Sequence, residues 1–275
     1  MAAPQPKADP LPNSVAQVAC VVHRGTDHTH DTRGVPEETP VALSYNGSCY
    51  AVMMATPSDL ADFALGFSLT SGIVGRPSDI ESLDILRHDE GVELRMWLAP
   101  APAAALAQRR RRLTGPTGCG LCGVETLADA LPPVRRVPEG TTISARSIAA
   151  ALPLLVAEQA LHRETGAMHA AGFFVPGKGM VSVREDVGRH NALDKLIGDL
   201  MRRGIAGADG FVVLTSRISV EMVQKAAVLG TCAIVAVSAP TALAVRVAEQ
   251  AGITLVAGAR GDVFDTFSGA FRIVP

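Results

Sequence analysis

Alternating apolar and polar residues predict two β-hairpins in the first hundred residues of the chain. One surrounds Asn46-Gly47, a dipeptide that strongly favours a tight two-residue turn. The other turns through Asp89-Glu90-Gly91. The four predicted strands are Val41–Tyr45, Ser48–Met54, Leu83–Arg87 and Val92–Leu98.

A helix is predicted between the two hairpins. Apolar residues recur from Leu60 to Phe67 at the i, i+3, i+4, i+7 spacing of one helix face. Thr56 is typical of a helix N-cap, Pro57 of a first helical position and Asp59 of the first turn. We expect this helix to pack one face on the first hairpin, so that this part of the chain forms a small α+β unit with antiparallel strands.

The second half of the chain alternates between short apolar strands and helices. The predicted strands are Ala171–Val175, Met180–Arg184, Phe211–Thr215, Ala233–Val237 and Ile253–Ala257. The predicted helices are Ser147–Leu161, Asn191–Met201, Val220–Leu229 and Ala242–Ala251. Three apolar strands separated by helices predict an α/β fold with a mostly parallel sheet that helices cover on both faces.

A proline-rich stretch, Leu131–Pro138, separates the two halves and is typical of a linker. The expected organisation has four parts. These are a disordered or extended N-terminal segment (1–36), a smaller N-terminal α+β domain (37–112), a mobile Cys-X-X-Cys loop with its linker (113–140) and a C-terminal α/β domain (141–275).

Bulk composition narrows the class of protein. Hydrophobic residues make up 48% of the 275 residues, which is enough to bury a sizeable core in one large domain or two modest ones. The formal net charge of −2 gives no reason to expect binding to nucleic acid or to an anionic membrane surface.

Neither secretion nor membrane insertion is expected. Met1–Ser14 lacks the basic and apolar regions of a signal peptide. The uncharged stretch 226–245 approaches transmembrane length, but Gly230 and Pro240 interrupt it. Five scattered cysteines in a chain of this length fit a reducing compartment, so we expect a cytoplasmic protein.

Cys119 and Cys122 lie in the segment 114–123, in which four of the ten residues are glycine. Because glycine does not fix the backbone conformation, we expect the pair on a mobile loop rather than at a helix start. Three kinds of site use two cysteines at this spacing: structural zinc, a dithiol redox centre and a sulfur-carrying thiol. A zinc site needs four ligands, and the sequence has no second Cys-X-X-Cys or close histidine pair.

Spacing alone does not choose between redox chemistry and sulfur transfer. Four consecutive arginines, Arg109–Arg112, precede the cysteine pair, and nearby cations stabilise a thiolate. These arginines are equally typical of a solvated helix face or of a contact for an acidic partner. The other cysteines, Cys20, Cys49 and Cys232, lie in apolar strand-like contexts, where we expect them to be small buried hydrophobic residues.

Polar and basic residues follow four of the predicted strands. In open α/β sheets, ligands bind beyond the carboxyl ends of the strands, where helix N-termini direct amides at anions. These residues are therefore expected to form one rim suited to phosphate or a nucleotide, although neither the dinucleotide-binding nor the P-loop fingerprint is present. The four segments are Glu185–Asn191, Thr215–Arg217, Ser238–Thr241 and Gly258–Asp262.

Each of these polar groups also has a purely structural interpretation. Ser238 and Thr241 are typical of helix caps. The remaining alternatives are a surface ion pair of Asp186 with Arg189, a solvated helix pair of Glu221 with Lys225, and a core position for His169.

Several blocks of sequence together resemble the formate dehydrogenase accessory proteins, the FdhD sulfurtransferases. The resemblance covers about residues 37–274, and its most specific block lies within Arg184–Ile197. The other blocks are Glu38–Val41, Ala55–Leu60 with Gly66-Phe67, Cys119–Gly123, His162 with Gly166–Ala171, Thr215–Lys225 and Ser238–Ala244.

The resemblance implies a sulfurtransferase. Members of the family take sulfur from a cysteine desulfurase as a persulfide and pass it to the molybdenum (or tungsten) bis-guanine-dinucleotide cofactor, before that cofactor enters formate dehydrogenase. By this likeness, Cys119 would carry the persulfide, Cys122 would assist, and the protein would be a homodimer. A non-catalytic cofactor chaperone and a dithiol redox protein are the alternative functions.

The resemblance also implies where the cofactor binds. The family's cofactor-binding stretch corresponds to Gly258, Ala259, Arg260, Gly261, Asp262 and Val263, with GDP as a mimic of the nucleotide part. Further contacts are expected from rim residues, namely His169, Arg189, His190, Arg217, Ser219, Ser238 and Thr241. The family's fold is similar to that of cytidine deaminases, but no deaminase zinc motif follows His169, so neither deamination nor a resident metal is expected.

Overall fold

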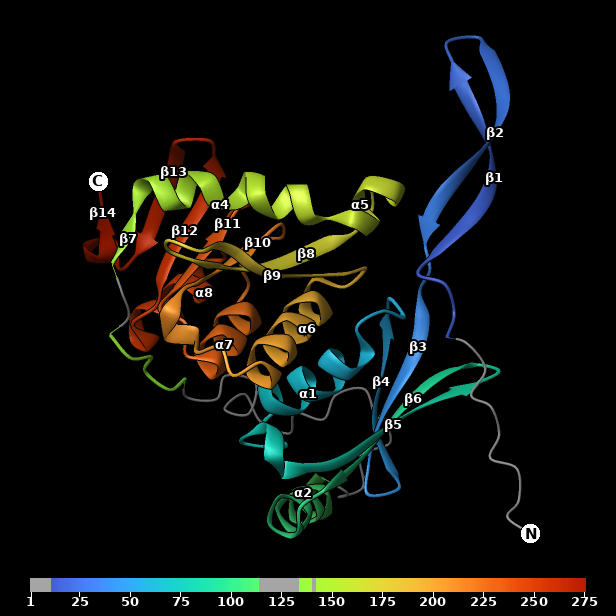
Figure 1. The fold of residues 1–275 in the computed structure, drawn as a ribbon, viewed down its shortest axis with the longest axis vertical. Helices are drawn as coiled ribbons and strands as arrows, with labels where there is room; N and C mark the ends of the chain where they lie inside the picture. Colours follow the sequence, from blue (N-terminus) through green and yellow to red (C-terminus); the bar gives the residue numbers. More distant parts are fainter. Residues whose placement is uncertain (1–10, 114–133, 140–141) are drawn as a thin grey trace.

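The computed structural model describes residues 11–113, 134–139 and 142–275. Figure 1 shows a projecting N-terminal hairpin, a small N-terminal sheet and a larger α/β part. The predicted cysteine loop, with Cys119 and Cys122, lies outside the described residues. Among the described residues, no helix has the length and apolar character needed to cross a membrane.

The N-terminal sheet confirms both predicted hairpins. Its strands are β3 (Thr39–Tyr45), β4 (Ser48–Ala55), β5 (Ile80–His88) and β6 (Gly91–Leu98), in the order β4-β3-β6-β5. Asn46 and Gly47 have positive φ values of 49° and 77°, as a primed hairpin turn requires. The two antiparallel hairpins join through β3 and β6, which pair in parallel.

The predicted helix forms as α1 (Leu60–Thr70), but Thr56 is not its N-cap. The cap is Asp59, in the left-handed region with φ of 51°. The Thr56 backbone N–H donates to Asp186 Oδ2 (3.0 Å), and its hydroxyl accepts from the N–H of Val187 (3.1 Å). Thr56 therefore joins the N-terminal sheet to the α/β part, a long-range role that overrides its local preference for a cap.

The larger sheet has six strands in the order β13-β12-β11-β10-β8-β9. They are β8 (His169–Val175), β9 (Gly179–Asp186), β10 (Phe211–Leu214), β11 (Ala233–Ala236), β12 (Thr254–Arg260) and β13 (Val263–Ser268). Only β10, β11 and β12 run parallel, so the expectation of a mostly parallel sheet is wrong in detail. The connections β8–β9 and β12–β13 are too short for a parallel crossover and force antiparallel pairing.

Helices cover both faces of this sheet, which confirms the layered α/β class. On one face lie α6 (Arg189–Arg202), α7 (Val220–Leu229) and α8 (Ala242–Ala251), and on the other lies α4 (Ala145–Glu158) (Figure 1). The single helix predicted over 147–161 is two helices, because α4 ends at Glu158 and α5 (Ala160–Thr165) follows. Each face has its own cluster of buried apolar residues.

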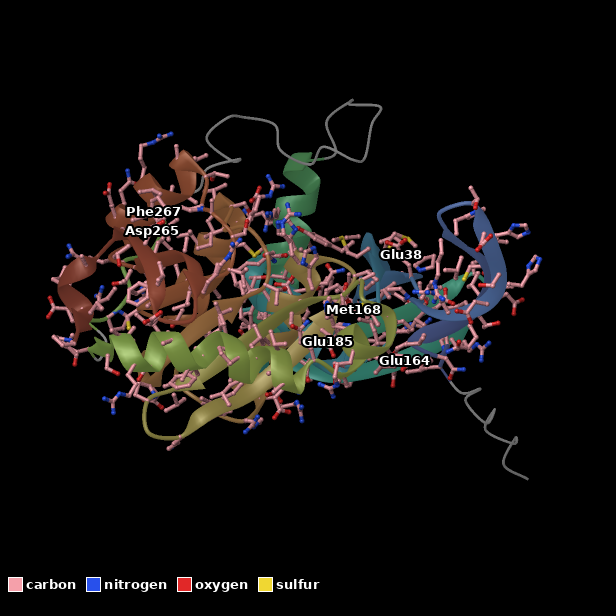
Figure 2. All side chains as sticks on the ribbon, turned by 90° about the horizontal axis from the view of Figure 1, so that it is seen from above. Glu38, Glu164, Met168, Glu185, Asp265 and Phe267 are labelled. Carbon is pink, nitrogen blue, oxygen red and sulfur yellow. The ribbon has the colours of Figure 1, made fainter. Side chains whose placement is uncertain are left out.

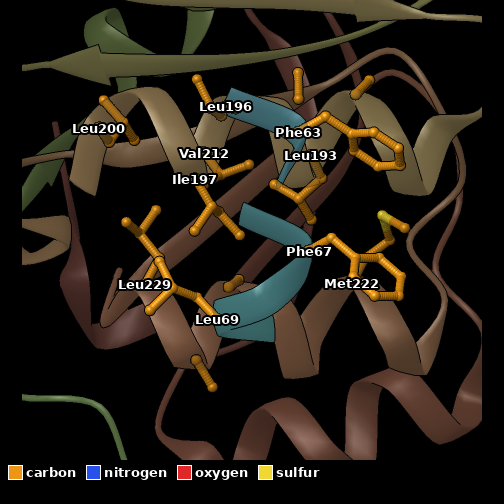
Figure 3. Packing of buried hydrophobic residues seen from close by; sticks show 14 of the residues in the cluster. Phe63, Phe67, Leu69, Leu193, Leu196, Ile197, Leu200, Val212, Met222 and Leu229 are labelled. Atoms are coloured by element: carbon orange, nitrogen blue, oxygen red, sulfur yellow. The ribbon is translucent and has the colours of Figure 1, made fainter. Parts of the chain in front are cut away.

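One hydrophobic core joins the N-terminal sheet to the larger sheet, with α1 between them. Nine of the eleven residues of α1 are buried, so the helix packs on several sides rather than on the one predicted face. Figure 3 shows α1 beside α6, with Phe63 and Phe67 next to Leu193 and Ile197.

Glycines allow α1 and α6 to approach closely. A Cβ atom built at Gly66 would overlap the main-chain carbonyl of Asp194. The reciprocal position gives the same result, since a Cβ at Gly198 would overlap the carbonyl of Asp62. This crossing therefore requires glycine on both helices.

The segment expected to be disordered or extended contains a regular hairpin. It is formed by β1 (Val15–Arg24) and β2 (Asp27–Pro36), which pair along their full length and turn at Gly25. Most of its side chains are exposed, so it lacks the buried apolar face on which strand prediction depends. The remaining elements are α2 (Pro100–Leu113), β7 (Ile143–Ser144), β14 (Ile273–Val274) and single helical turns at Pro77–Asp79, Gly207–Asp209 and Ala270–Arg272.

Candidate functional site

The sheet brings the predicted rim residues to one side, at the carboxyl ends of its parallel strands. β10, β11 and β12 are parallel, so the polar segments that follow them lie at the same edge. The antiparallel neighbours extend this edge, because β8 and β13 begin there and β9 ends there. His169, at the start of β8, lies directly opposite Asp186, at the end of β9. We call this edge, with its loops and helix N-termini, the rim.

The loops after β10 and β11 are tied together at the rim. The N–H of Ile218 donates to the carbonyl of Ala239 (3.3 Å), and the N–H of Thr241 donates back to the carbonyl of Ile218 (3.0 Å). Thr215 is used internally, since its hydroxyl accepts from the N–H of Ala170 (2.9 Å). In the same loop Arg217 is exposed, so its guanidinium is open to solvent.

Three helices begin at the rim. Thr241 is the N-cap of α8 and accepts from the N–H of Ala244 (3.2 Å), which confirms its structural interpretation as a cap. Ser219 and Gly188 cap α7 and α6 without a hydrogen bond from a side chain. Ser238 lies in the loop before Thr241, partly buried, and is not a cap. The first turns of α6 and α7 can therefore donate amides to an anion.

Arg189, His169 and His190 form a cluster where α6 begins. Burial is the main cause that lowers the pKa of both histidines, and the positive charge of Arg189 lowers both further. The Nε atom of Arg189 is buried without a hydrogen-bond partner. Two neutral imidazoles beside an incompletely paired guanidinium make a group of donors suited to an oxyanion.

Neither ion pair that the structural interpretation of these residues offered is present. Asp186 does not pair with Arg189, because its carboxylate is fully buried against Lys195. Glu221 and Lys225 do not form a solvated pair either. Lys225 Nζ donates to Asp194 (2.7 Å), whereas Glu221 Oε2 lies 3.9 Å from His190 Nε2.

The stretch 258–263 comprises the end of β12, a two-residue turn at Gly261 and Asp262, and the first residue of β13. Gly258 and Gly261 have φ values of 62° and 61°, a conformation that favours glycine. Ala259 is buried, whereas Arg260, Asp262 and Val263 are exposed. In the sheet β12 lies three positions from β8, which carries His169, and at about 4.8 Å per strand the two strands are about 14 Å apart.

Figure 2 shows the same separation between β13 and the region where β8 begins. Asp265 and Phe267 of β13 lie at one end, while Met168 and Glu185 lie towards the N-terminal hairpin. Glu185 is a residue whose role the sequence did not indicate. Its carboxylate accepts from the N–H groups of Leu161 and His162, both at 2.8 Å, and so fixes the start of α5.

The described cysteines differ from expectation in two cases out of three. Cys232 is buried, and burial raises the pKa of its thiol. Cys20 is only partly buried and Cys49 is exposed, because both belong to hairpins with an open face. Arg109, in the arginine run, donates to the carbonyl of Ser71 (3.1 Å). Within the described parts of the chain, no three His, Cys, Asp or Glu side chains are grouped to hold a metal ion.

Comparison with known proteins gives consistent matches over almost the whole chain. The model of the FdhD/NarQ family matches residues 36–274. A protein from Agrobacterium fabrum is 50% identical over 257 residues, which cover 92% of this chain and 93% of the relative. One from Brucella abortus is 52% identical over 255 residues, covering 92% and 95%. Both are named sulfur carrier protein FdhD.

A solved structure agrees with the fold. It is the crystal structure of a candidate formate dehydrogenase accessory protein from Desulfotalea psychrophila. The TM-score is 0.73, with 24% identity, over 96% of this chain and 100% of the other. The mixed α/β architecture is therefore shared with a protein of quite different sequence.

Proposed function

This chain belongs to the FdhD/NarQ family, and from this premise we propose that it is a sulfurtransferase in the maturation of formate dehydrogenase. The family match extends from residue 36 to 274. Relatives that share about half of their residues with it, over more than nine-tenths of their own length, are named as sulfur carriers. These matches support sulfur transfer as the general activity.

The chemistry proposed for the cysteines is persulfide transfer. The Cys119 thiolate attacks the outer sulfur of a persulfide on a cysteine desulfurase, and the desulfurase cysteine leaves as its thiolate. The new S–S bond makes Cys119 the carrier, and transfer of the outer sulfur to an acceptor restores the Cys119 thiolate. Cys122 assists by the same exchange, because its thiolate can take the outer sulfur from Cys119, which leaves as a thiolate. The glycine-rich surroundings of the pair in the sequence support this carrier role.

The proposed acceptor is the molybdenum or tungsten bis-guanine-dinucleotide cofactor, which the protein handles as a substrate. The observation that carries this part is Arg189, whose buried Nε lacks a partner at the N-terminus of α6, beside His169 and His190. These groups would bind a phosphate of one nucleotide arm. The stretch 258–263, at the other end of the rim, would receive the second arm.

Other rim residues would complete the site. Arg217 is exposed in the loop after β10, Ser219 follows it at the start of α7, and Ser238 lies in the loop after β11. The proposed partners are a cysteine desulfurase as sulfur donor, the catalytic subunit of formate dehydrogenase as recipient of the finished cofactor, and a second copy of this chain in a homodimer.

A sulfur-loading experiment tests the carrier function. The purified protein is incubated with a cysteine desulfurase and cysteine, and peptide masses are then measured under non-reducing conditions. We expect a gain of one sulfur atom on the peptide that contains Cys119, which is lost in Cys119→Ala and kept in Cys49→Ala. A protein that activates formate dehydrogenase with both Cys119 and Cys122 replaced by serine would instead be a cofactor chaperone.

A nucleotide-binding experiment tests the rim. GDP stands in for one arm of the cofactor, and its affinity is measured by calorimetry. We expect Arg189→Ala to weaken GDP binding by at least about tenfold, since a charge-assisted contact contributes about 1.5–3 kcal/mol. Arg246→Ala, at an exposed arginine of α8, is the matched control. Equal losses in both variants would point to bulk charge rather than to a site.

A further inference from the structure

A fully buried ion pair lies beneath the start of α6. Lys195 Nζ is 2.7 Å from Asp186 Oδ2, and both side chains are completely excluded from solvent. Lysine and aspartate are almost never buried in this way unless something holds them in place. None of the steps proposed above uses either residue.

The Asp186 carboxylate is saturated with hydrogen bonds. Oδ1 accepts from the N–H of Gly188 (2.7 Å) and from Asn191 Nδ2 (3.0 Å). Oδ2 accepts from the N–H of Thr56 (3.0 Å) as well as from Lys195. Lys195 Nζ also donates to the carbonyl of Thr56 (2.9 Å). One carboxylate thus ties the end of β9, the first turn of α6 and the end of the N-terminal sheet to one point.

Stability alone does not explain such a pair. Removing two charges from water costs about as much as their attraction returns, so a well-packed apolar pair is often equally stable or more stable. What the pair adds is a single geometry. The bond from Gly188 to Asp186 spans the turn that immediately precedes Arg189, and Val187 is held from the other side by the Thr56 hydroxyl (3.1 Å).

We propose that Asp186 and Lys195 are positioning residues that hold the turn before α6 so that Arg189 stays beside His169 and His190 at the rim. The register supports this directly, because Asp186 and His169 are paired across β9 and β8. The nucleotide-binding consequence rests on the function proposed above. The geometric consequence is independent of that function, because it concerns only the position of Arg189 relative to the two histidines.

The titration of His190 separates positioning from general stabilisation. Apart from its burial, the charged groups that set its pKa are Arg189 and Lys225, which lower it, and Glu221 and Asp194, which raise it. Neither Asp186 nor Lys195 is among them. The double variant decides the question, because it removes one charge of each sign and leaves the net charge unchanged. A change in its His190 pKa therefore reports a movement of the surroundings of His190. If Arg189 moves away, the pKa of His190 rises.

The experiment uses Lys195→Met, the double variant Asp186→Asn with Lys195→Met, and Asp199→Asn as the control. Asp199 is equally buried near the other end of α6, where it accepts from Ser182 (2.8 Å) and Arg203 (2.9 Å). The double variant leaves no unpaired charge in the interior, so it keeps the test possible if Lys195→Met does not fold. Thermal unfolding, histidine titration by NMR and the affinity for GDP are measured for each.

Positioning predicts a higher His190 pKa and GDP binding at least tenfold weaker in folded variants of the pair, with both quantities unchanged in Asp199→Asn. Loss of thermal stability with an unchanged His190 pKa and unchanged GDP affinity would overturn the proposal. If the wild-type protein does not bind GDP, the nucleotide part of the proposed function fails. The His190 titration then still decides whether the pair positions Arg189.

Discussion

Substitution of Gly66 by alanine tests the contact that joins the N-terminal part of the chain to the larger sheet. A methyl group there would overlap the main-chain carbonyl of Asp194 on α6. Because the obstruction is backbone rather than a flexible side chain, the two helices must separate to accommodate it. Separation loosens the packing of Phe63 and Phe67 against Leu193.

Two opposing effects set the magnitude. Alanine is favoured over glycine in a helix interior by about 1 kcal/mol, which would stabilise an unobstructed position. Overpacking in a core costs about 1–3 kcal/mol, and a main-chain obstruction lies at the upper end of that range. The free energy of unfolding should therefore fall by about 2 kcal/mol in Gly66→Ala. The melting temperature should fall by about 4–8 °C, at about 2–4 °C for each kcal/mol.

The assay is urea and thermal unfolding followed by circular dichroism. Ala61→Gly is the matched control, because Ala61 is exposed on the same helix and reports helix propensity alone. It should lose at most about 1 kcal/mol, because Ala61 lies in the first turn rather than in the helix interior. A Gly66→Ala protein as stable as the wild type, or more stable, would show that α1 and α6 can separate freely and would refute the packing argument.

Three further predictions concern buried groups. Burial and Arg189 lower the pKa of His169 and His190. Below the ordinary imidazole pKa the unfolded chain therefore binds more protons than the folded protein. The free energy of unfolding should fall as the pH is lowered from about 7.5 to about 5.5. Urea titrations should show a shallower fall in His190→Gln, and an unchanged slope would contradict this. Lys225→Met leaves the buried Asp194 carboxylate without its cation and should cost up to about 3 kcal/mol, partly restored by adding Asp194→Asn. Cys232 should resist a thiol reagent until the protein unfolds, since burial raises its pKa; rapid labelling of the native protein would show that it is accessible.

Local pattern predicted the individual elements of the fold well. Val220–Leu229 and Ala242–Ala251 form helices over the predicted residues, because their apolar spacing and their caps are properties of adjacent positions. The hairpin at Asn46-Gly47 is confirmed for the same reason. The β1–β2 hairpin escaped prediction because it has no buried face to impose a periodic pattern.

The rim could be predicted only in outline. Polar residues after successive strands share an edge whenever those strands are parallel, so Thr215–Arg217 and Ser238–Thr241 were placed together from sequence alone. Individual roles were not accessible in this way. Lys225 binds Asp194 rather than Glu221, and Asp186 binds Lys195 rather than Arg189, since each carboxylate pairs with the cation that the packed helices bring near it.

The sequence by itself determined most of the strands and helices, the glycine-flanked cysteine pair and the blocks that carry the family resemblance. Tertiary structure alone decided that α1 is buried on several sides, that the sheet is mixed and that a lysine and an aspartate are sealed beneath the rim. The physical reason is separation along the chain. Thr56 and Asp186 are 130 residues apart, and burial and charge pairing between such residues arise only when the packed core brings them into contact.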